Sequence, residues 1–269
     1  MSSDPESIKI ANDSGFPLQI AVERSVAETT ESHGWTVRYV EHAWSNHLDQ
    51  QSGFIDLVLQ DNDKSIFLVV ECKRLRQATW VFMHSKGEIA VRRNAKSWVS
   101  HYSNGKFKQF GWHDVPLDPA CPEAVYCAVR GQSSNDKTTL LERVGGELIS
   151  ATEALTLEEK DFRTPTRPTF RLYYNVIVTT ADLKVAKFDP KDVSLADGTL
   201  ANAEINDVPF VRFRKQLSMR PALLTPHDYM NGVRVAYAKE NTVFVVHADA
   251  LVPFLEQFDV PYNDTKKFD

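Results

Sequence analysis

The stretch that decides the fold is residues 53–74, GFIDLVLQDNDKSIFLVVECKR. Two apolar runs, residues 55–60 and 66–70, flank a short polar turn and are typical of neighbouring β-strands. A tight turn between the two strands brings Asp56, near the start of the first, beside Glu71, at the end of the second. Glu71 and Lys73 are two residues apart, so they share one face of their strand. The stretch therefore predicts two carboxylates and an ammonium group at one end of a sheet.

These three side chains are the components of a metal-assisted hydrolytic site. Mg²⁺ prefers oxygen ligands and keeps several waters, so Asp56 and Glu71 would bind it, with the backbone carbonyl of Cys72 as a third oxygen. Lys73 would orient or deprotonate the attacking water, or neutralise charge on a phosphate; deprotonation requires a lowered lysine pKa. The alternative is an ordinary surface Glu-x-Lys pair with an unrelated aspartate. Charges that end two apolar strands favour the metal site.

The composition is that of an ordinary soluble globular protein, and the cysteine usage predicts a cytoplasmic location. The formal net charge of −5 argues against a protein that coats nucleic acid by bulk positive charge. No apolar run reaches the roughly 20 residues of a membrane-spanning helix, and the first residues lack the pattern of a secretory signal, so we expect no membrane partner. The three cysteines, Cys72, Cys121 and Cys127, have no metal-ligand spacing and indicate reduced thiols.

A basic block begins beside this site and runs on from it. Residues 64–108 contain ten lysines and arginines but only two acidic residues. Such a block is often a solvated helix face, but its position beside two carboxylates favours a polyanionic partner. The candidate nucleic-acid contacts are Arg74, Arg76, Arg92, Arg93 and Lys96.

Helices and strands alternate along the chain, which predicts an α/β or mixed α+β fold. Helices are expected at residues 17–32, 87–102, 136–160 and 248–258. Strands are expected at residues 35–44, 124–129, 170–180, 210–213 and 242–246, with short strands and turns over residues 182–208. Residues 103–122 are expected to form a loop whose aromatic side chains pack beneath it or stack on bases. Residues 165–168 are expected to be a connector inside one elaborated domain of residues 1–269.

Three segments together resemble the PD-(D/E)XK nuclease superfamily, which has the restriction-endonuclease-like fold, and within it the Mrr-type restriction endonucleases. The segments are residues 22–27 with 34–37, residues 54–58, and residues 69–74. In the family, a helix with a glutamate precedes a strand, the metal-binding aspartate follows, and Glu or Gln stands two residues before a lysine. The resemblance implies these roles for Glu23, Asp56, Glu71 and Lys73. Ile55 stands where the superfamily name has proline.

The resemblance implies a restriction-endonuclease-like core, a central mixed β-sheet of about four strands flanked by helices, completed by strand 124–129. The nuclease core would span about residues 16–180, with an elaborated C-terminal extension at about residues 181–269. The expected activity is a Mg²⁺-dependent nuclease acting on DNA in restriction or phage defence, with Mn²⁺ as a substitute metal. The alternatives are a non-catalytic nucleic-acid-binding module with the same fold and a metal-free interaction protein. A homodimer is left open, because one site cuts one strand.

Overall fold

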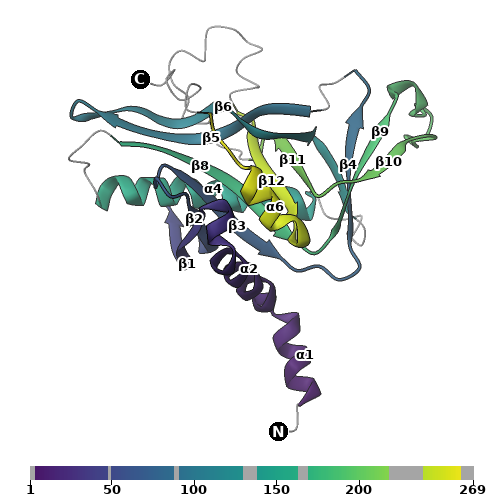
Figure 1. Ribbon diagram of the computed structural model, residues 1–269. Helices are drawn as coiled ribbons and strands as arrows, with labels where there is room; N and C mark the ends of the chain where they lie inside the picture. Colours follow the sequence, from purple (N-terminus) through teal and green to yellow (C-terminus); the bar gives the residue numbers. More distant parts are fainter. Residues whose placement is uncertain are drawn as a thin grey trace.

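The computed structural model of the chain describes residues 4–47, 50–87, 91–129, 138–162, 169–217 and 239–261. The described strands are β1 (Thr36–Asn46), β2 (Gln51–Gln60), β3 (Ile66–Lys73), β4 (Thr79–Ser85), β5 (Val91–Ser103), β6 (Lys106–Ala124), β7 (Tyr126–Val129), β8 (Thr169–Thr179), β9 (Asp182–Phe188), β10 (Glu204–Asp207), β11 (Phe210–Lys215) and β12 (Asn241–His247). The described α-helices are α1 (Pro5–Asp13), α2 (Phe16–Glu28), α3 (Thr30–His33), α4 (Leu140–Phe162) and α6 (Leu251–Gln257). The fold is therefore mixed α/β, as the sequence predicts (Figure 1).

The main sheet has eight strands in the order β1-β2-β3-β8-β12-β11-β6-β5, and a second sheet has the order β10-β9-β4-β7. β2 is antiparallel to both β1 and β3, whereas β3, β8 and β12 run parallel to one another. β8 pairs with β5 as well, so β8, β12, β11, β6 and β5 close into a ring. Strands β11 and β12 from the C-terminal half thus belong to the main sheet and are not an appendage to it.

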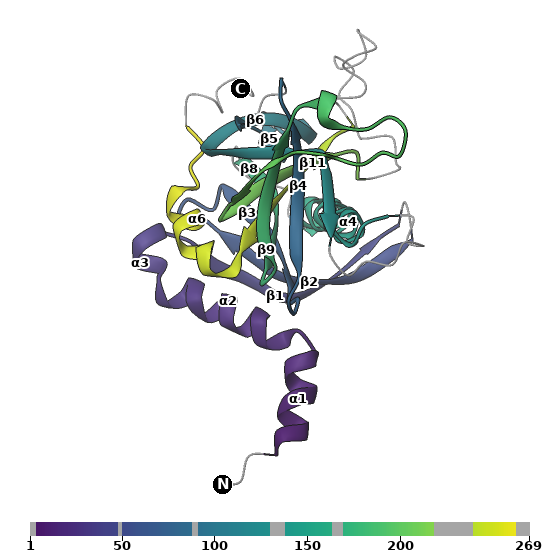
Figure 2. The ribbon, with the colours of Figure 1, turned by 90° about the vertical axis from the view of Figure 1, so that its right-hand side faces the viewer.

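Helices cover both faces of the strands β1, β2, β3 and β8. α2 and α6 lie on one face and α4 lies on the other (Figure 2). The expected stripe of Leu18, Val22 and Val26 on α2 is buried against alternate residues of β2 and β3. On the opposite face, α4 packs a stripe at helical spacing, which includes Leu141 and Leu148. The α4 face is the one that carries Glu71 and Lys73, because the side chains of β3 alternate between the faces.

Two predicted elements are wrong. The expected helix at residues 87–102 is replaced by the strand β5, and the expected loop at residues 103–122 is replaced by its antiparallel partner β6. The five consecutive residues of β5 from Ala95 to Val99 are all buried, so the strand lacks the alternation that would identify it. β6 accommodates Pro116 and Pro122 at the pairing with β5, whose register shifts between Arg92 and Asn94.

A third prediction is wrong in its pairing only. The strand at residues 124–129 exists as β7, but it pairs with β4 in the second sheet, and β8 takes the place beside β3. The expected helix at residues 17–32 is divided at Thr29 into α2 and α3. The connector at residues 165–168 lies outside the described residues. No described helix is long and apolar enough to cross a membrane.

Candidate active site

Asp56 and Glu71 stand where the ladder between β2 and β3 ends. The last backbone pair of that ladder is Leu57 with Val70, so the next residue of each strand carries a carboxylate. In place of a further backbone pair, the Asp56 carboxylate accepts a 2.6 Å hydrogen bond from the backbone amide of Cys72. On the other side, Gln19 of α2 donates its side-chain amide to the backbone carbonyl of Asp56, at 3.2 Å. Asp56 is thus held by both β3 and α2.

Lys73 belongs to the same site, because its ammonium group forms an ion pair with Glu71. The Lys73 Nζ lies 2.5 Å from the Glu71 Oε1, and both side chains lie on the α4 face of the sheet. The backbone carbonyl of Lys73 accepts a 2.9 Å hydrogen bond from the hydroxyl of Thr179 on β8, which fixes the end of β3. The structure therefore brings together three of the four predicted catalytic residues.

The carboxylates of the site are desolvated and repel each other. Burial, together with the nearby Asp56 carboxylate, raises the pKa of Glu71 to about 7, although Lys73 acts in the opposite direction. Burial also raises the pKa of Asp56, against the Cys72 amide and Lys73, which lower it. Neutralising this charge with a cation would relieve both effects.

Lys73 is held as an ammonium ion. Burial alone would lower its pKa, but Glu71 and Asp56 outweigh burial and raise the pKa of Lys73 above its ordinary value. Of the roles open to Lys73, charge neutralisation and orientation of a water fit this environment, because proton abstraction requires a neutral amine.

The site offers a metal ion only a few protein oxygen atoms, which suits Mg²⁺ because Mg²⁺ keeps several of its waters. No group of three or more His, Cys, Asp or Glu side chains among the described residues is arranged to hold a metal ion. A Mg²⁺ would therefore take Asp56 and Glu71 and complete its shell with water and substrate oxygens. The Cys72 thiol packs in the core on the α2 face, and burial raises its pKa, so Cys72 offers a metal only its backbone carbonyl.

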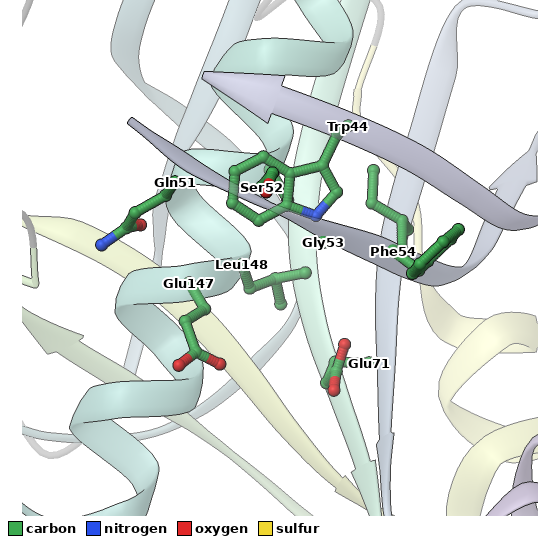
Figure 3. A pocket seen from close by; sticks show the side chains of 10 residues that line it. Trp44, Gln51, Ser52, Gly53, Phe54, Glu71, Glu147 and Leu148 are labelled. Carbon is green, nitrogen blue, oxygen red and sulfur yellow. The ribbon is translucent and has the colours of Figure 1, made fainter. Parts of the chain in front are cut away.

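A pocket of about 320 Å³ adjoins Glu71 (Figure 3). Its lining comes from Trp44 of β1, residues 51–55 of β2, Glu71 of β3, and Glu147, Leu148 and Ala151 of α4. Glu147 is a third carboxylate near the site, and it contributes to the raised pKa of Glu71. No local pattern in the sequence singles out Glu147, which follows the Gly145-Gly146 pair on α4.

Glu23 is not joined to the other three candidates. It lies on α2, one turn after Gln19, and α2 packs on the face of the sheet opposite to Glu71 and Lys73. Within the described part of the chain, Glu23 forms no hydrogen bond or ion pair with Asp56 or with the Glu71–Lys73 pair. Its assignment rests on the family resemblance.

The basic residues nearest to the site are tied to α1. The guanidinium of Arg74 donates a hydrogen bond to the backbone carbonyl of Asn12. Arg76 forms a 2.6 Å ion pair with Asp13, and the Arg76 side chain is 57% exposed. Arg76 thus combines a position near Lys73 with access to solvent.

The remaining basic candidates lie on the strand β5. The Arg93 guanidinium is half exposed and pairs with Asp118 at 3.0 Å. Lys96 is only 7% exposed and pairs with Asp114 at 3.0 Å, so its ammonium is not presented to solvent. The backbone of Arg92 pairs with β6, and its side chain lies outside the described part of the structure. The basic block is therefore not one continuous helix face.

Known proteins give no direct guide to this site. Comparisons of the chain with protein-family models, with curated proteins and with solved structures gave no match. The features that bear on function are therefore the geometry of Asp56, Glu71 and Lys73 and the pocket beside them.

Proposed function

We propose that this chain is a Mg²⁺-dependent nuclease that hydrolyses phosphodiester bonds of DNA. The observation that carries the proposal is the convergence of Asp56, Glu71 and Lys73 at the end of the β2–β3 ladder. Two desolvated carboxylates that repel each other form a place for a divalent cation, and the adjoining ammonium suits a phosphate.

The surrounding fold supports the same proposal. The resemblance to PD-(D/E)XK nucleases implies a central mixed sheet flanked by helices, with the aspartate and the Glu-x-Lys motif on neighbouring strands. Asp56 and Glu71 lie on adjacent strands of a mixed sheet with helices on both faces. A restriction-endonuclease-like core would comprise β1, β2, β3 and β8, with β8 in the position first expected for residues 124–129.

Each residue of the site has a role that its contacts support. Bound at Asp56 and Glu71, Mg²⁺ or Mn²⁺ would supply a water nucleophile at neutral pH and charge stabilisation at the scissile phosphate. The Cys72 amide and Gln19 hold Asp56 in place from opposite sides. The Lys73 ammonium, anchored by Glu71, neutralises the negative charge that develops on the phosphate oxygens.

The biological setting belongs to the proposal as well. A nuclease of this type suits restriction or phage defence in the cytoplasm. Cleavage of both strands of DNA would favour a homodimer, because one site cuts one strand at a time. The retained Asp56, Glu71 and Lys73 favour an enzyme over a non-catalytic nucleic-acid-binding module of the same fold.

A nuclease assay tests the proposal directly. The purified chain is incubated with plasmid, linear and single-stranded DNA and with RNA, in Mg²⁺ or Mn²⁺. We expect Asp56→Asn and Lys73→Ala each to reduce DNA cleavage by about 100-fold or more while the circular dichroism spectrum is unchanged. Asp63→Asn, in the exposed turn between β2 and β3, is the matched control and should cleave normally. Cleavage by Asp56→Asn at the wild-type rate would sink the assignment, and binding without cleavage would favour the binding module.

A further inference from the structure

The pocket beside Glu71 has the wrong charge for a phosphate. None of its described lining residues is a lysine or an arginine, whereas Glu71 and Glu147 both contribute carboxylates to its wall. Figure 3 shows the two carboxylates lying at the same end of the pocket, below the Trp44 ring. A phosphate diester in this pocket would face two like charges. The pocket therefore suits an uncharged part of a nucleotide.

The opposite walls of the pocket suit an aromatic ring. The side chains of Trp44 and Leu148 are buried and form an apolar part of the pocket wall. Phe54, which also lines the pocket, is 62% exposed. Gly53 keeps the space beside the Trp44 indole free of a side chain, because a Cβ at position 53 would lie 3.4 Å from the Trp44 Nε1. The exposed ring of Phe54 is a surface on which an unstacked base can pack. The volume of about 320 Å³ is that of a small-molecule pocket and cannot admit a duplex.

Glu147 adds a hydrogen-bond acceptor to the wall of this pocket. Its side chain is exposed, and no described lysine or arginine forms an ion pair with it. Glu71 differs, because its carboxylate is already bound by Lys73. An ionised carboxylate accepts hydrogen bonds and donates none, so it favours the exocyclic amines of adenine, cytosine and guanine over thymine, whose one ring donor, N3–H, is flanked by two carbonyl oxygens that repel a carboxylate.

We propose that the pocket between the β1–β2 strand pair and α4 receives one unstacked nucleobase of the substrate, and that Glu147 selects bases with an exocyclic amine. The proposal rests on the nuclease function, because Glu71 belongs both to the pocket and to the metal site. A base held there would place its own phosphate beside Glu71 and Lys73. The substrate class is then single-stranded DNA, or duplex DNA from which one nucleotide is extruded.

Cleavage of matched oligonucleotides by the full chain in Mg²⁺ tests this proposal. The oligonucleotides differ only in the base beside the cleaved bond, which is adenine, cytosine, guanine, thymine or absent. We expect kcat/KM to be about tenfold higher for the amine-bearing bases than for thymine or the abasic site. Glu147→Gln should remove the preference over thymine, because an amide donates as well as accepts. Phe54→Ala should raise KM for every base and leave kcat unchanged.

Two variants on the second sheet serve as matched controls. Glu204→Gln alters an exposed glutamate of β10, and Tyr126→Ala removes an aromatic ring of β7 that is 63% exposed, as Phe54 is 62% exposed. Both should keep the wild-type base preference. Equal kcat/KM on all five substrates, or an unchanged preference in Glu147→Gln, would overturn the base pocket and leave the nuclease standing. Failure of the wild-type chain to cleave any nucleic acid would overturn the nuclease function itself.

Discussion

The backbone amide of Cys72 donates a 2.6 Å hydrogen bond to the carboxylate of Asp56. This bond links β3 to β2 just beyond the last pair of their ladder, Leu57 with Val70, because Asp56 lies one residue beyond that pair and Cys72 lies two. It satisfies an amide that has lost its strand partner and turns the Asp56 carboxylate toward the Glu71 side of the sheet. The candidate metal site is therefore built into the end of the ladder, and a change at Asp56 affects both the chemistry and the backbone.

Two substitutions at Asp56 separate these two effects. Asp56→Asn keeps a side-chain oxygen to accept from the Cys72 amide, whereas Asp56→Ala leaves that amide unsatisfied. We expect Asp56→Ala to be less stable than Asp56→Asn by about 1–3 kcal/mol, the cost of a buried unpaired donor. Urea unfolding at pH 7 measures the difference, and nuclease assays should find both variants inactive. Equal free energies of unfolding would contradict the role of this bond.

Glu71 makes stability and metal binding depend on pH in opposite directions. Its pKa is about 7 in the folded chain, against the ordinary value of 4.5. The folded state therefore binds the proton more tightly, and the free energy of unfolding should fall by roughly 3 kcal/mol as pH rises from about 4.5 to about 7. Mg²⁺ requires the ionised carboxylate, so its stabilising effect should grow over the same range.

Urea unfolding between pH 5 and pH 8, with and without Mg²⁺, measures both trends. Glu71→Gln is the control, because glutamine does not titrate. In this variant the part of the pH dependence that comes from Glu71 should disappear, both without Mg²⁺ and with it. A stabilisation by Mg²⁺ that is independent of pH would show that Glu71 is not a ligand.

The sequence predicts the centre of the site because that centre is local. Asp56, Glu71 and Lys73 lie on two strands joined by one turn, so alternation and strand ends place them without knowledge of the rest of the fold. Glu147 lies on α4, far along the chain, and reaches the pocket only through the packing of α4 on the sheet. A Cβ at Gly146 would lie 3.0 Å from the backbone oxygen of Leu217, so the adjacent glycines serve a close approach that no local pattern reveals.

The sequence predicts the elements that have a clear helical spacing or a long apolar run, and it misses β5, a buried strand with polar residues among its apolar ones. The stripe of Leu18, Val22 and Val26 predicts α2, and the long apolar run of β8 predicts a central strand. β5 differs, because it pairs with both β6 and β8 and its successive residues from Ala95 to Val99 are all buried. A fully buried strand loses the period of two, and its apolar spacing then also fits a helix.

Under the proposed nuclease function, Arg76 is the basic candidate best placed to contact DNA. It lies three residues after Lys73, and its guanidinium is 57% exposed. Arg76→Gln should weaken DNA binding uniformly across sequences and reduce the slope of log K against log salt concentration by about one, the effect of one lost phosphate contact. Fluorescence anisotropy over a salt series measures the slope. Arg24→Gln on α2, which is also exposed, is the control, and an unchanged slope in Arg76→Gln would exclude the contact.

Asp114 neutralises two buried cations. Its carboxylate lies 3.0 Å from the Lys96 Nζ and 2.9 Å from the Arg214 Nη1, and these cations are only 7% and 5% exposed. Burial raises the pKa of Asp114, but Lys96 and Arg214 outweigh burial and lower it below the ordinary value. The stabilisation is therefore present above the unfolded-state pKa of about 3.8 and is lost as pH falls through the lower folded value.

Asp114→Asn should lower the free energy of unfolding by about 3–5 kcal/mol, because it leaves the buried Lys96 ammonium without its carboxylate, whereas Arg214 keeps its ion pair with Glu240. Asp118→Asn breaks the half-exposed pair with Arg93 on the same hairpin and should cost at most about 1 kcal/mol. Urea unfolding at pH 7 compares the two variants. A similar small loss in both would mean that Lys96 does not depend on Asp114.

Gly53 controls how much of the pocket is open. A Cβ at this position would make ordinary contact with the Trp44 ring, at 3.4 Å, so Gly53→Ala should fold and cleave nearly as the wild type does. Gly53→Leu extends the side chain into the space in front of the indole and should raise KM for DNA by at least about tenfold, since a pocket discriminates strongly against lost volume. The melting temperature of Gly53→Ala should be close to that of the wild type. For Gly53→Leu the decisive measurement is KM and kcat determined separately, because a blocked pocket raises KM. If Gly53→Leu cleaves DNA with the wild-type KM, substrate does not enter this pocket.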